Sequence, residues 1–294
     1  MVIRDFNSSG RLFIHFFISD KINVITTNKV ASRYLGSLAQ QGYFKESAFT
    51  TDAEYNIKSN ITLSNKDVTE EEVLSEWDSM FSKKTKKDIL FLYRSPVERT
   101  MTGIVQEFYE DVFDGVGHGG DFKLQLILEN FIGGPSFYSK VLLRPQWYSA
   151  NNEEWIPIFD EKDFEILETL LVSYLEKFAL SDIINRDHTS TYITYLYNLL
   201  ISDRLDMNKV SIIEIQKNKR ALENTLKLYF DLDGVGVNKS SNTFLLKRIE
   251  SNRKYTKHGF YHNIVNKVKV ALDSELFFYN KILSLPNNIL DKKI

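Results

Sequence analysis

The sequence predicts an α/β protein with a central parallel sheet flanked by helices. Short apolar runs of strand length alternate with longer segments in which apolar residues recur at helical spacing, and this alternation is typical of parallel sheets with helical crossovers. The 294 residues are 43% hydrophobic and 26% charged, which is enough apolar material for a substantial core. The C-terminal part is expected to be rich in helices and to close on a helix over residues 272–283.

The first elements follow from composition and spacing. Residues 12–18 and 22–27 have the apolar and β-branched composition of strands, and residues 30–41 have the spacing of a helix. The polar residues 50–66 predict a loop. The acidic residues at positions 70–72 suit a helix N-terminus, so a helix is expected from there to about residue 81.

A second strand that leads into a helix has a more distinct sequence pattern. Residues 88–93 form the short apolar run of a buried parallel strand, which ends before Arg94. Pro96 fits the first turn of the helix predicted over residues 97–109. Further predictions are helices at residues 163–178 and 191–201 and a strand at residues 210–215. No repeat and no long biased linker divides the sequence, so residues 1–294 are predicted to form a single domain.

Charge and cysteine content exclude several functions. The formal net charge of −2 gives no global attraction to nucleic acid or membranes, so no nucleic-acid partner is expected. The chain has no cysteine, which excludes disulfides, thiolate metal sites and thiol nucleophiles, and no His, Asp and Glu cluster has the spacing of a metal site. The N-terminal apolar run is broken by His15 and Asp20, and no segment approaches the roughly 20 apolar residues of a membrane span. A cytoplasmic location is therefore expected.

Lys29 lies between a predicted strand and a predicted helix. Unpaired backbone N–H groups and the helix dipole attract an anion at such a junction, Lys29 adds a full charge, and Ser32 adds a hydroxyl donor. The nucleotide-binding pattern GxxxxGK[ST] is absent because no glycine precedes Lys29 in this turn. The junction therefore predicts an anion site of a different kind from an ATP-cradling loop.

Arg94 marks a second candidate anion site. It leaves the end of a predicted strand, while Thr102 lies eight residues later, two turns into the following helix. A guanidinium and a hydroxyl in this arrangement are expected to converge on one phosphate group. Arg99 adds a further positive charge in the same segment.

These two segments resemble the motifs of PAPS-dependent sulfotransferases. The segment Lys29-Val30-Ala31-Ser32-Arg33 is similar to the family's 5′-phosphosulfate loop, which reads roughly Lys-x-Gly-[Thr/Ser]-[Thr/Ser]. Arg94, Pro96 and Thr102 stand at the positions of the 3′-phosphate motif, with Thr102 where the family has serine. Ala31 and Arg33 depart from the family pattern. Near the end of the chain, Asn238-Lys239-Ser240 resembles an element that is common late in carbohydrate sulfotransferases.

The resemblance implies a P-loop-like three-layer fold and PAPS, 3′-phosphoadenosine 5′-phosphosulfate, as cofactor. Lys29 would hold the 5′-phosphosulfate and stabilise the departing phosphate, while Arg94 and Thr102 would hold the 3′-phosphate. The cofactor-binding residues that the resemblance implies are Lys29, Val30, Ala31, Ser32, Arg33, Tyr34, Arg94, Thr102 and Lys239.

The base that removes the acceptor's proton has two candidates. Glu46, in Phe44-Lys45-Glu46-Ser47-Ala48-Phe49, lies in a segment similar to the Lys-Glu-x-x-Phe segment of glycan sulfotransferases. His188 precedes a predicted helix and then a strand that contains Glu214, an order similar to a histidine segment of the family, and histidine titrates near working pH. His15 is expected to pack within its strand.

The expected acceptor is a small molecule or a glycan, with a carbohydrate or glycolipid favoured by analogy. A basic stretch runs from Lys247 to Lys269, where seven bases and one acid, Glu250, give 7 − 1 = +6. It is interpreted either as a solvated face or as a loop that closes over the 3′-phosphate or receives an anionic glycan. Two alternatives stay open: a P-loop-like kinase or nucleotide hydrolase, and a non-catalytic nucleotide-binding module on the same fold.

Overall fold

The protein divides into two compact units, each assembled from separated parts of the chain. The structure is a computed structural model that describes residues 12–27, 30–51, 57–63, 68–82, 85–109, 161–177, 192–215, 219–232, 242–257 and 259–285. The first unit comprises Met1–Arg99, Ser190–Asn238 and Leu272–Ile294, and the second comprises Thr100–Thr189 and Lys239–Ala271. A compact unit made of separate segments is not necessarily an independently folding domain, so the single domain stays a prediction.

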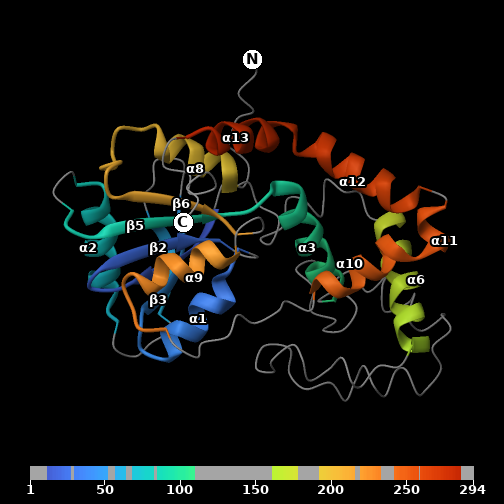
Figure 1. Ribbon diagram of the computed structural model, residues 1–294, viewed down its shortest axis with the longest axis horizontal. Helices are drawn as coiled ribbons and strands as arrows, with labels where there is room; N and C mark the ends of the chain where they lie inside the picture. Colours follow the sequence, from blue (N-terminus) through green and yellow to red (C-terminus); the bar gives the residue numbers. More distant parts are fainter. Residues whose placement is uncertain are drawn as a thin grey trace. The chain divides into compact units, whose positions relative to one another are not determined.

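One mixed sheet forms the centre of the first unit (Figure 1). Among the described residues it has six strands in the order β4-β3-β1-β2-β5-β6. The strands are β1 (Leu12–Ile18), β2 (Ile22–Thr26), β3 (Lys45–Thr51), β4 (Ile57–Leu63), β5 (Asp88–Tyr93) and β6 (Val210–Glu214). β5 pairs parallel with both β2 and β6, whereas β1 pairs antiparallel with both β2 and β3, and β3 pairs antiparallel with β4.

The predicted parallel sheet is therefore correct for one half and wrong for the other. Only three residues, 19–21, connect β1 to β2, and a link of that length closes a hairpin because a parallel pair needs a crossover of about a dozen residues. The Ser19 hydroxyl closes this turn by donating to the Ile22 carbonyl at 2.7 Å and accepting from the Ile22 N–H at 3.1 Å. The loop predicted over residues 50–66 is also wrong, since β3 extends to Thr51 and β4 follows.

Helices cover both faces of the sheet, which gives the first unit three layers (Figure 1). On one face lie α2 (Glu70–Met80), α8 (Tyr192–Leu200) and α13 (Asp273–Leu283), packed on a core that includes Phe16 and Phe91. Trp77 of α2 anchors this face, with its ring 5.5 Å from that of Phe16. On the other face, α1 (Ser32–Gln40) and α9 (Lys219–Lys227) bury Leu35 and Leu222 against Val24 and Leu90. The α/β class is thereby confirmed.

The second unit is helical in its described part. It contains α6 (Glu161–Lys177), α10 (Asn242–Ser251), α11 (Arg253–Thr256) and α12 (Phe260–Ala271). α3 (Pro96–Tyr109) passes from the first unit into the second between Arg99 and Thr100. Within the second unit its buried Phe108 packs on Tyr174 of α6, with ring centroids 5.6 Å apart. The predicted helix-rich C-terminal part is confirmed for the described residues that follow β6.

The parallel half of the sheet has the arrangement that positions ligands. β2, β5 and β6 lead respectively into α1, α3 and α9, so three helix N-termini follow three neighbouring strand ends. The carboxyl ends of parallel strands share one edge of a sheet, and in open α/β sheets ligands bind outside that edge. Tyr93 and Glu214, the last residues of β5 and β6, are register partners there.

Candidate functional site

Hydrogen bonds from Thr26 and Thr27 stabilise the turn between β2 and α1. The Thr26 hydroxyl donates to the Val30 carbonyl, and the Thr27 hydroxyl donates to the Phe13 carbonyl of β1 at 2.8 Å. The Val30 N–H donates to the Thr27 carbonyl at 3.2 Å. This turn is therefore anchored at the carboxyl end of β2, and it delivers Ala31 and Ser32 to the start of α1. Lys29 lies outside the described residues, as does the side chain of Arg33.

Ala31 has a backbone conformation that favours glycine. Its φ is 57°, in the left-handed region, and it directly precedes the first residue of α1. Ala31 therefore holds a turn geometry that glycine adopts more easily, at a cost in backbone strain.

The predicted loop residues contribute unequally. Ser32 is half-buried at the start of α1, where first-turn N–H groups lack intrahelical partners. Tyr34 is only 5% exposed and packs in the core beneath α1, and burial raises the pKa of its phenol. Its side chain is thus part of the core, and any role in binding would be limited to its backbone.

Arg94 follows β5 and lies half-buried next to two carboxylates. Burial lowers the pKa of its guanidinium, and the charges of Glu98 and Glu214 act in the opposite direction. Arg99, one turn further on, is only 3% exposed. Burial lowers the pKa of Arg99 to about 10, the charge of Glu275 opposes this, and the charge of Arg94 adds to it. The guanidinium of Arg94 is therefore near enough to disfavour the charged form of Arg99 in the first turns of α3.

Two buried glutamates face these arginines from the surrounding elements. Glu214, at the end of β6, accepts a hydrogen bond from the Tyr279 hydroxyl of α13 at 3.1 Å. Glu275, also on α13, accepts from the backbone N–H groups of Ile193 and Thr194 at 2.9 and 3.1 Å, and from the Thr194 hydroxyl. It therefore caps the N-terminus of α8 from another helix. Burial raises the pKa of the Glu275 carboxyl, while these hydrogen bonds lower it.

The charged side chains that the structure describes around Arg94 and Arg99 do not by themselves give a net positive charge that would attract an anion. Two guanidiniums, Arg94 and Arg99, stand against three carboxylates, those of Glu98, Glu214 and Glu275, which gives 2 − 3 = −1. Local attraction for an anion would therefore depend on Lys29 and on the helix N-termini. The charges of Glu98 and Glu214 favour the charged form of Arg94, and the charge of Glu275 favours that of Arg99. Arg99 and Glu275 have no local sequence signal that would pair them.

Thr102 is 2% exposed within α3 and belongs to the second unit, whereas Arg94 belongs to the first. Their convergence on one phosphate stays a prediction. His188 and Lys239 lie outside the described residues. Among the residues that are described, no group of three or more His, Asp and Glu side chains could hold a metal ion.

Glu46 lies on β3 beneath α1. Its Oε1 is 3.6 Å from Nδ1 of His15 on β1, and the two side chains are 18% and 16% exposed. A Cβ atom added to Gly36 of α1 would lie 3.3 Å from Glu46 Oε2, so the glycine leaves the space that the carboxylate occupies. The expectation that His15 packs in a strand is confirmed, but its position against Glu46 was missed because the register of β1 on β3 has no local signal.

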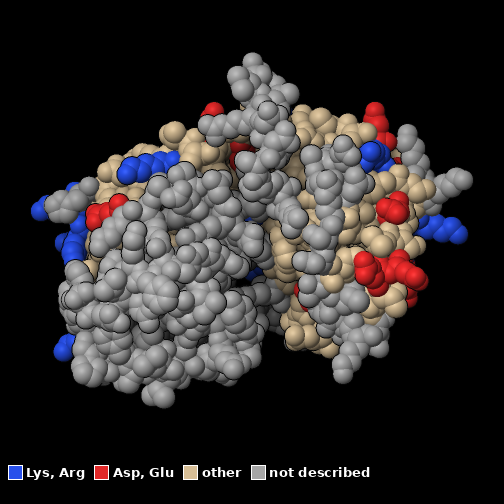
Figure 2. Space-filling view, turned by 180° about the vertical axis from the view of Figure 1, so that it is seen from behind, with Lys and Arg blue, Asp and Glu red and all other residues tan. Residues whose placement is uncertain are grey.

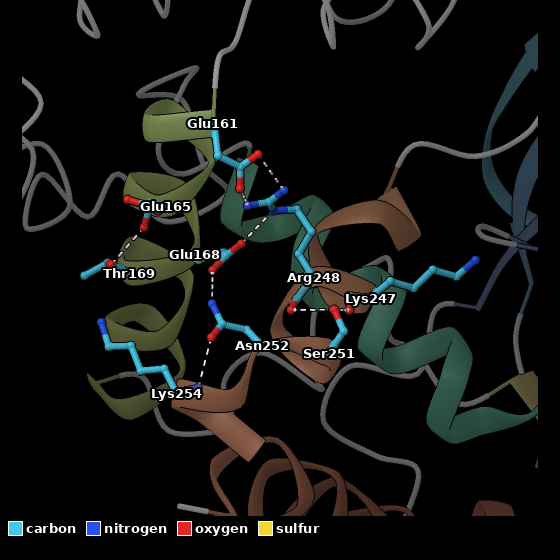
Figure 3. Close-up of polar contacts among 9 residues, drawn as sticks. All are labelled: Glu161, Glu165, Glu168, Thr169, Lys247, Arg248, Ser251, Asn252 and Lys254. Atoms are coloured by element: carbon cyan, nitrogen blue, oxygen red, sulfur yellow. Dashed lines mark hydrogen bonds and ion pairs between the residues drawn. The ribbon is translucent and has the colours of Figure 1, made fainter. Parts of the chain in front are cut away.

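The basic stretch forms helices in the second unit rather than a closing loop, which corrects that interpretation. Arg248 of α10 is bound to acids: its Nε donates to Glu168 Oε1 at 2.6 Å, and its Nη1 donates to Glu161 Oε2 at 3.2 Å (Figure 3). The other cations are exposed, and Figure 2 shows Lys and Arg side chains along the edge of the second unit that α11 and α12 form. Because Arg248 is engaged by acids, the remaining exposed cations of this stretch form a solvated basic face.

Comparison with known proteins adds no assignment: no family model, no curated protein and no solved structure matches the chain. In the described part of the chain, no helix combines the length and the apolar character needed to cross a membrane.

Proposed function

We propose that the protein is a sulfotransferase that moves a sulfuryl group from PAPS to a hydroxyl (or amine) group of an acceptor, with a carbohydrate or glycolipid as the favoured class. The observation that carries the proposal is the position of two candidate anion-binding segments. The turn after β2 and the turn after β5 follow neighbouring parallel strands, and each leads directly into a helix N-terminus. PAPS carries anionic groups at its 5′ and 3′ ends, so two adjacent anion sites suit it.

The two segments would bind different ends of PAPS. Lys29 and the backbone N–H groups of residues 30–34 would hold the phosphosulfate, with Lys29 stabilising the charge that develops on the departing phosphate. Arg94, together with Thr102, would hold the 3′-phosphate, with Arg99 adding charge nearby. Lys239 is retained as a cofactor-binding residue on the resemblance alone. Glu46 or His188 would remove the proton of the acceptor hydroxyl. Positioning and electrostatics supply most of such a rate enhancement.

One observation favours the rival function of a magnesium-dependent nucleotide-binding enzyme. Glu214 ends β6, and a carboxylate at a strand end is where such enzymes hold Mg²⁺. Against this, Glu214 is 1% exposed and is engaged by the Tyr279 hydroxyl. The rival predicts tight binding of ATP that requires Mg²⁺, and the sulfotransferase does not.

Calorimetric titration with adenosine 3′,5′-bisphosphate, the desulfated cofactor, tests the proposal in the absence of metal. The native protein should bind with a dissociation constant that is roughly micromolar, and Lys29→Ala and Arg94→Ala should each weaken binding roughly tenfold or more. Lys86→Ala is the matched control, since Lys86 is an exposed cation before the opposite end of β5. Absence of binding, or tighter binding of ATP with Mg²⁺, would overturn the proposal.

A further inference from the structure

His15 and Glu46 form an imidazole–carboxylate pair on two neighbouring strands. In the β1–β3 register Phe17 pairs with Glu46 and His15 pairs with Ala48, so His15 and Glu46 are diagonal neighbours. Residues two apart on a strand share a face, which puts both side chains on one side of the sheet. Nδ1 of the imidazole faces Oε1 of the carboxylate at 3.6 Å. Catalytic hydrogen bonds are often this long before substrate binds.

The pair adjoins the proposed phosphosulfate turn. His15 is the register partner of Thr26, the last residue of β2. The hydroxyl of the next residue, Thr27, bonds to the carbonyl of Phe13 on β1, so the start of β1 and this turn are tied together. Gly36, one turn into α1, lies over Glu46. The imidazole and the carboxylate therefore lie between the strand end and the first turns of the helix that follows it.

Neighbouring groups fix the orientation of both side chains. The Phe13 ring meets the imidazole edge-on at a centroid distance of 5.0 Å, and the Phe17 ring lies nearly parallel to it at 6.3 Å. Glu46 has the imidazole near one oxygen and the space left by Gly36 near the other. An acid that orients a histidine, which in turn serves a hydroxyl group, is the arrangement of activated-nucleophile sites generally.

We propose that His15 is the general base of the sulfuryl transfer and that Glu46 positions it, which reassigns the role given to Glu46 above. The inference rests on the proposed function. His15 Nε2 takes the proton from the acceptor hydroxyl as its oxygen forms a bond to sulfur. The bond from sulfur to the 5′-phosphate oxygen breaks, its electron pair stays on that phosphate, and Glu46 accepts the Nδ1–H of the imidazolium. The products are the sulfate ester, adenosine 3′,5′-bisphosphate and protonated His15.

Kinetics and nucleotide binding of His15→Asn provide the first test. The variant should lose roughly 10²- to 10⁴-fold in kcat, the usual contribution of general base catalysis, while its affinity for adenosine 3′,5′-bisphosphate stays within about twofold of native. His262→Asn, which changes an exposed histidine of the second unit, is the matched control and should leave kcat unchanged. A His15→Asn protein with native kcat, or one that loses nucleotide binding together with kcat, would overturn the assignment.

The role of Glu46 is tested by a signature that does not depend on turnover. In ¹⁵N NMR spectra of the neutral imidazole, the native protein should show the Nδ1–H tautomer, which Glu46→Gln should shift toward a mixture of tautomers. Gly36→Ala, which places a Cβ atom 3.3 Å from the carboxylate, should lower kcat without changing nucleotide affinity. An unchanged tautomer in Glu46→Gln would overturn the positioning role.

The two proposals fail in different ways. If the native protein does not bind adenosine 3′,5′-bisphosphate, the sulfotransferase proposal fails, and the catalytic role of His15 fails with it. If the native protein binds the nucleotide and transfers sulfuryl groups but His15→Asn does so equally well, only the base assignment is lost. In that case the kcat of Glu46→Gln shows whether the Glu46 carboxylate is itself the general base.

Discussion

Each of the two units buries a glutamate that joins helices, but the two glutamates bind different partners. In the first unit, Glu275 binds backbone N–H groups of α8, and its charge reaches Arg99. In the second unit, Glu168 binds Arg248 directly and accepts from Asn252 Nδ2 at 2.9 Å, so that α6 is fastened to the α10–α11 segment (Figure 3). The two carboxylates are 4% and 2% exposed, so burial does not distinguish them.

The arginines distinguish the two clusters. Arg248 is bound by carboxylates on two sides, as in a structural ion-pair network. Arg94 and Arg99 also have carboxylates nearby, but in addition the charge of Arg94 disfavours the charged form of Arg99. Holding like charges together at a strand end costs stability, and such clusters of perturbed groups are enriched at functional sites. This effect of Arg94 on Arg99 distinguishes the cluster after β5 from the α6–α10 contact, where no like charge among the described residues acts on Arg248.

Glu275→Ala should produce the largest change in stability. It removes the cap of α8 and leaves Arg99 buried without its compensating charge, so the free energy of unfolding should fall by about 3–5 kcal/mol. Urea denaturation followed by circular dichroism measures this. Glu275→Gln keeps an acceptor for α8 and should lie between the native protein and Glu275→Ala. Equal stability of the native protein and Glu275→Ala would contradict the account of this cluster.

Glu168→Ala should cost less, about 1–3 kcal/mol, because Arg248 keeps Glu161 and partial access to water. The matched control is Glu161→Ala, which removes an exposed carboxylate from the same guanidinium and should leave the urea midpoint unchanged. The same denaturation experiment ranks the three alanine variants. If Glu168→Ala were as destabilising as Glu275→Ala, the distinction between the two clusters would fail at the level of stability.

Ala31→Gly should stabilise the strand-end turn. Glycine removes the cost of a left-handed alanine, about 1–2 kcal/mol, but adds backbone entropy to the unfolded chain, so a net gain of about 0.5–1 kcal/mol is expected. Asp203→Gly, at the other described non-glycine residue with positive φ, is the control for the same backbone effect far from the proposed loop in sequence. Thermal unfolding of both variants measures the gain. A loss of stability specific to Ala31→Gly would mean that the methyl group makes a contact that outweighs the strain.

The smallest effect is expected in alkaline solution at the opposite end of β5. Burial raises the pKa of Tyr229 from 10.0 to about 12, helped by the hydrogen bond that its hydroxyl donates to Asp88 at 2.7 Å. Because the folded-state pKa is the higher one, this stability is fully present below pH 10 and is lost as pH rises toward 12. Tyr229→Phe should therefore show a shallower loss of stability over this range. An identical pH dependence in both proteins would contradict the assignment.

Local sequence patterns predicted where strands and helices lie better than they predicted the direction in which neighbouring strands pair. The strand over residues 88–93 was predicted with its observed bounds because its apolar run is ended by Arg94-Ser95-Pro96. The antiparallel direction of β1 and β2 follows from a three-residue link, yet the alternation of strands and helices pointed to a parallel sheet. β4 was missed because its sequence, IKSNITL, has too little apolar material to separate it from a loop.

The candidate site was predictable only where its residues follow strand ends. Arg94 was identified because a cation after an apolar run and before a proline has a local pattern. Glu275 and Arg99 lie on distant parts of the chain and meet only through tertiary packing, which no spacing rule expresses. His15 was expected only to pack within its strand, because its position against Glu46 depends on the register of two strands. Charge pairs of this kind become visible only with the fold.

Substituting the two contrasted arginines tests the central claim most directly. Arg94→Gln and Arg248→Gln would be compared with the native protein by calorimetric titration with adenosine 3′,5′-bisphosphate, after circular dichroism has shown that both variants are folded. The account predicts that Arg94→Gln weakens binding roughly tenfold or more, whereas Arg248→Gln binds as the native protein does. Equal affinities for Arg94→Gln and the native protein, or equal losses in both variants, would contradict an anion site at the strand ends.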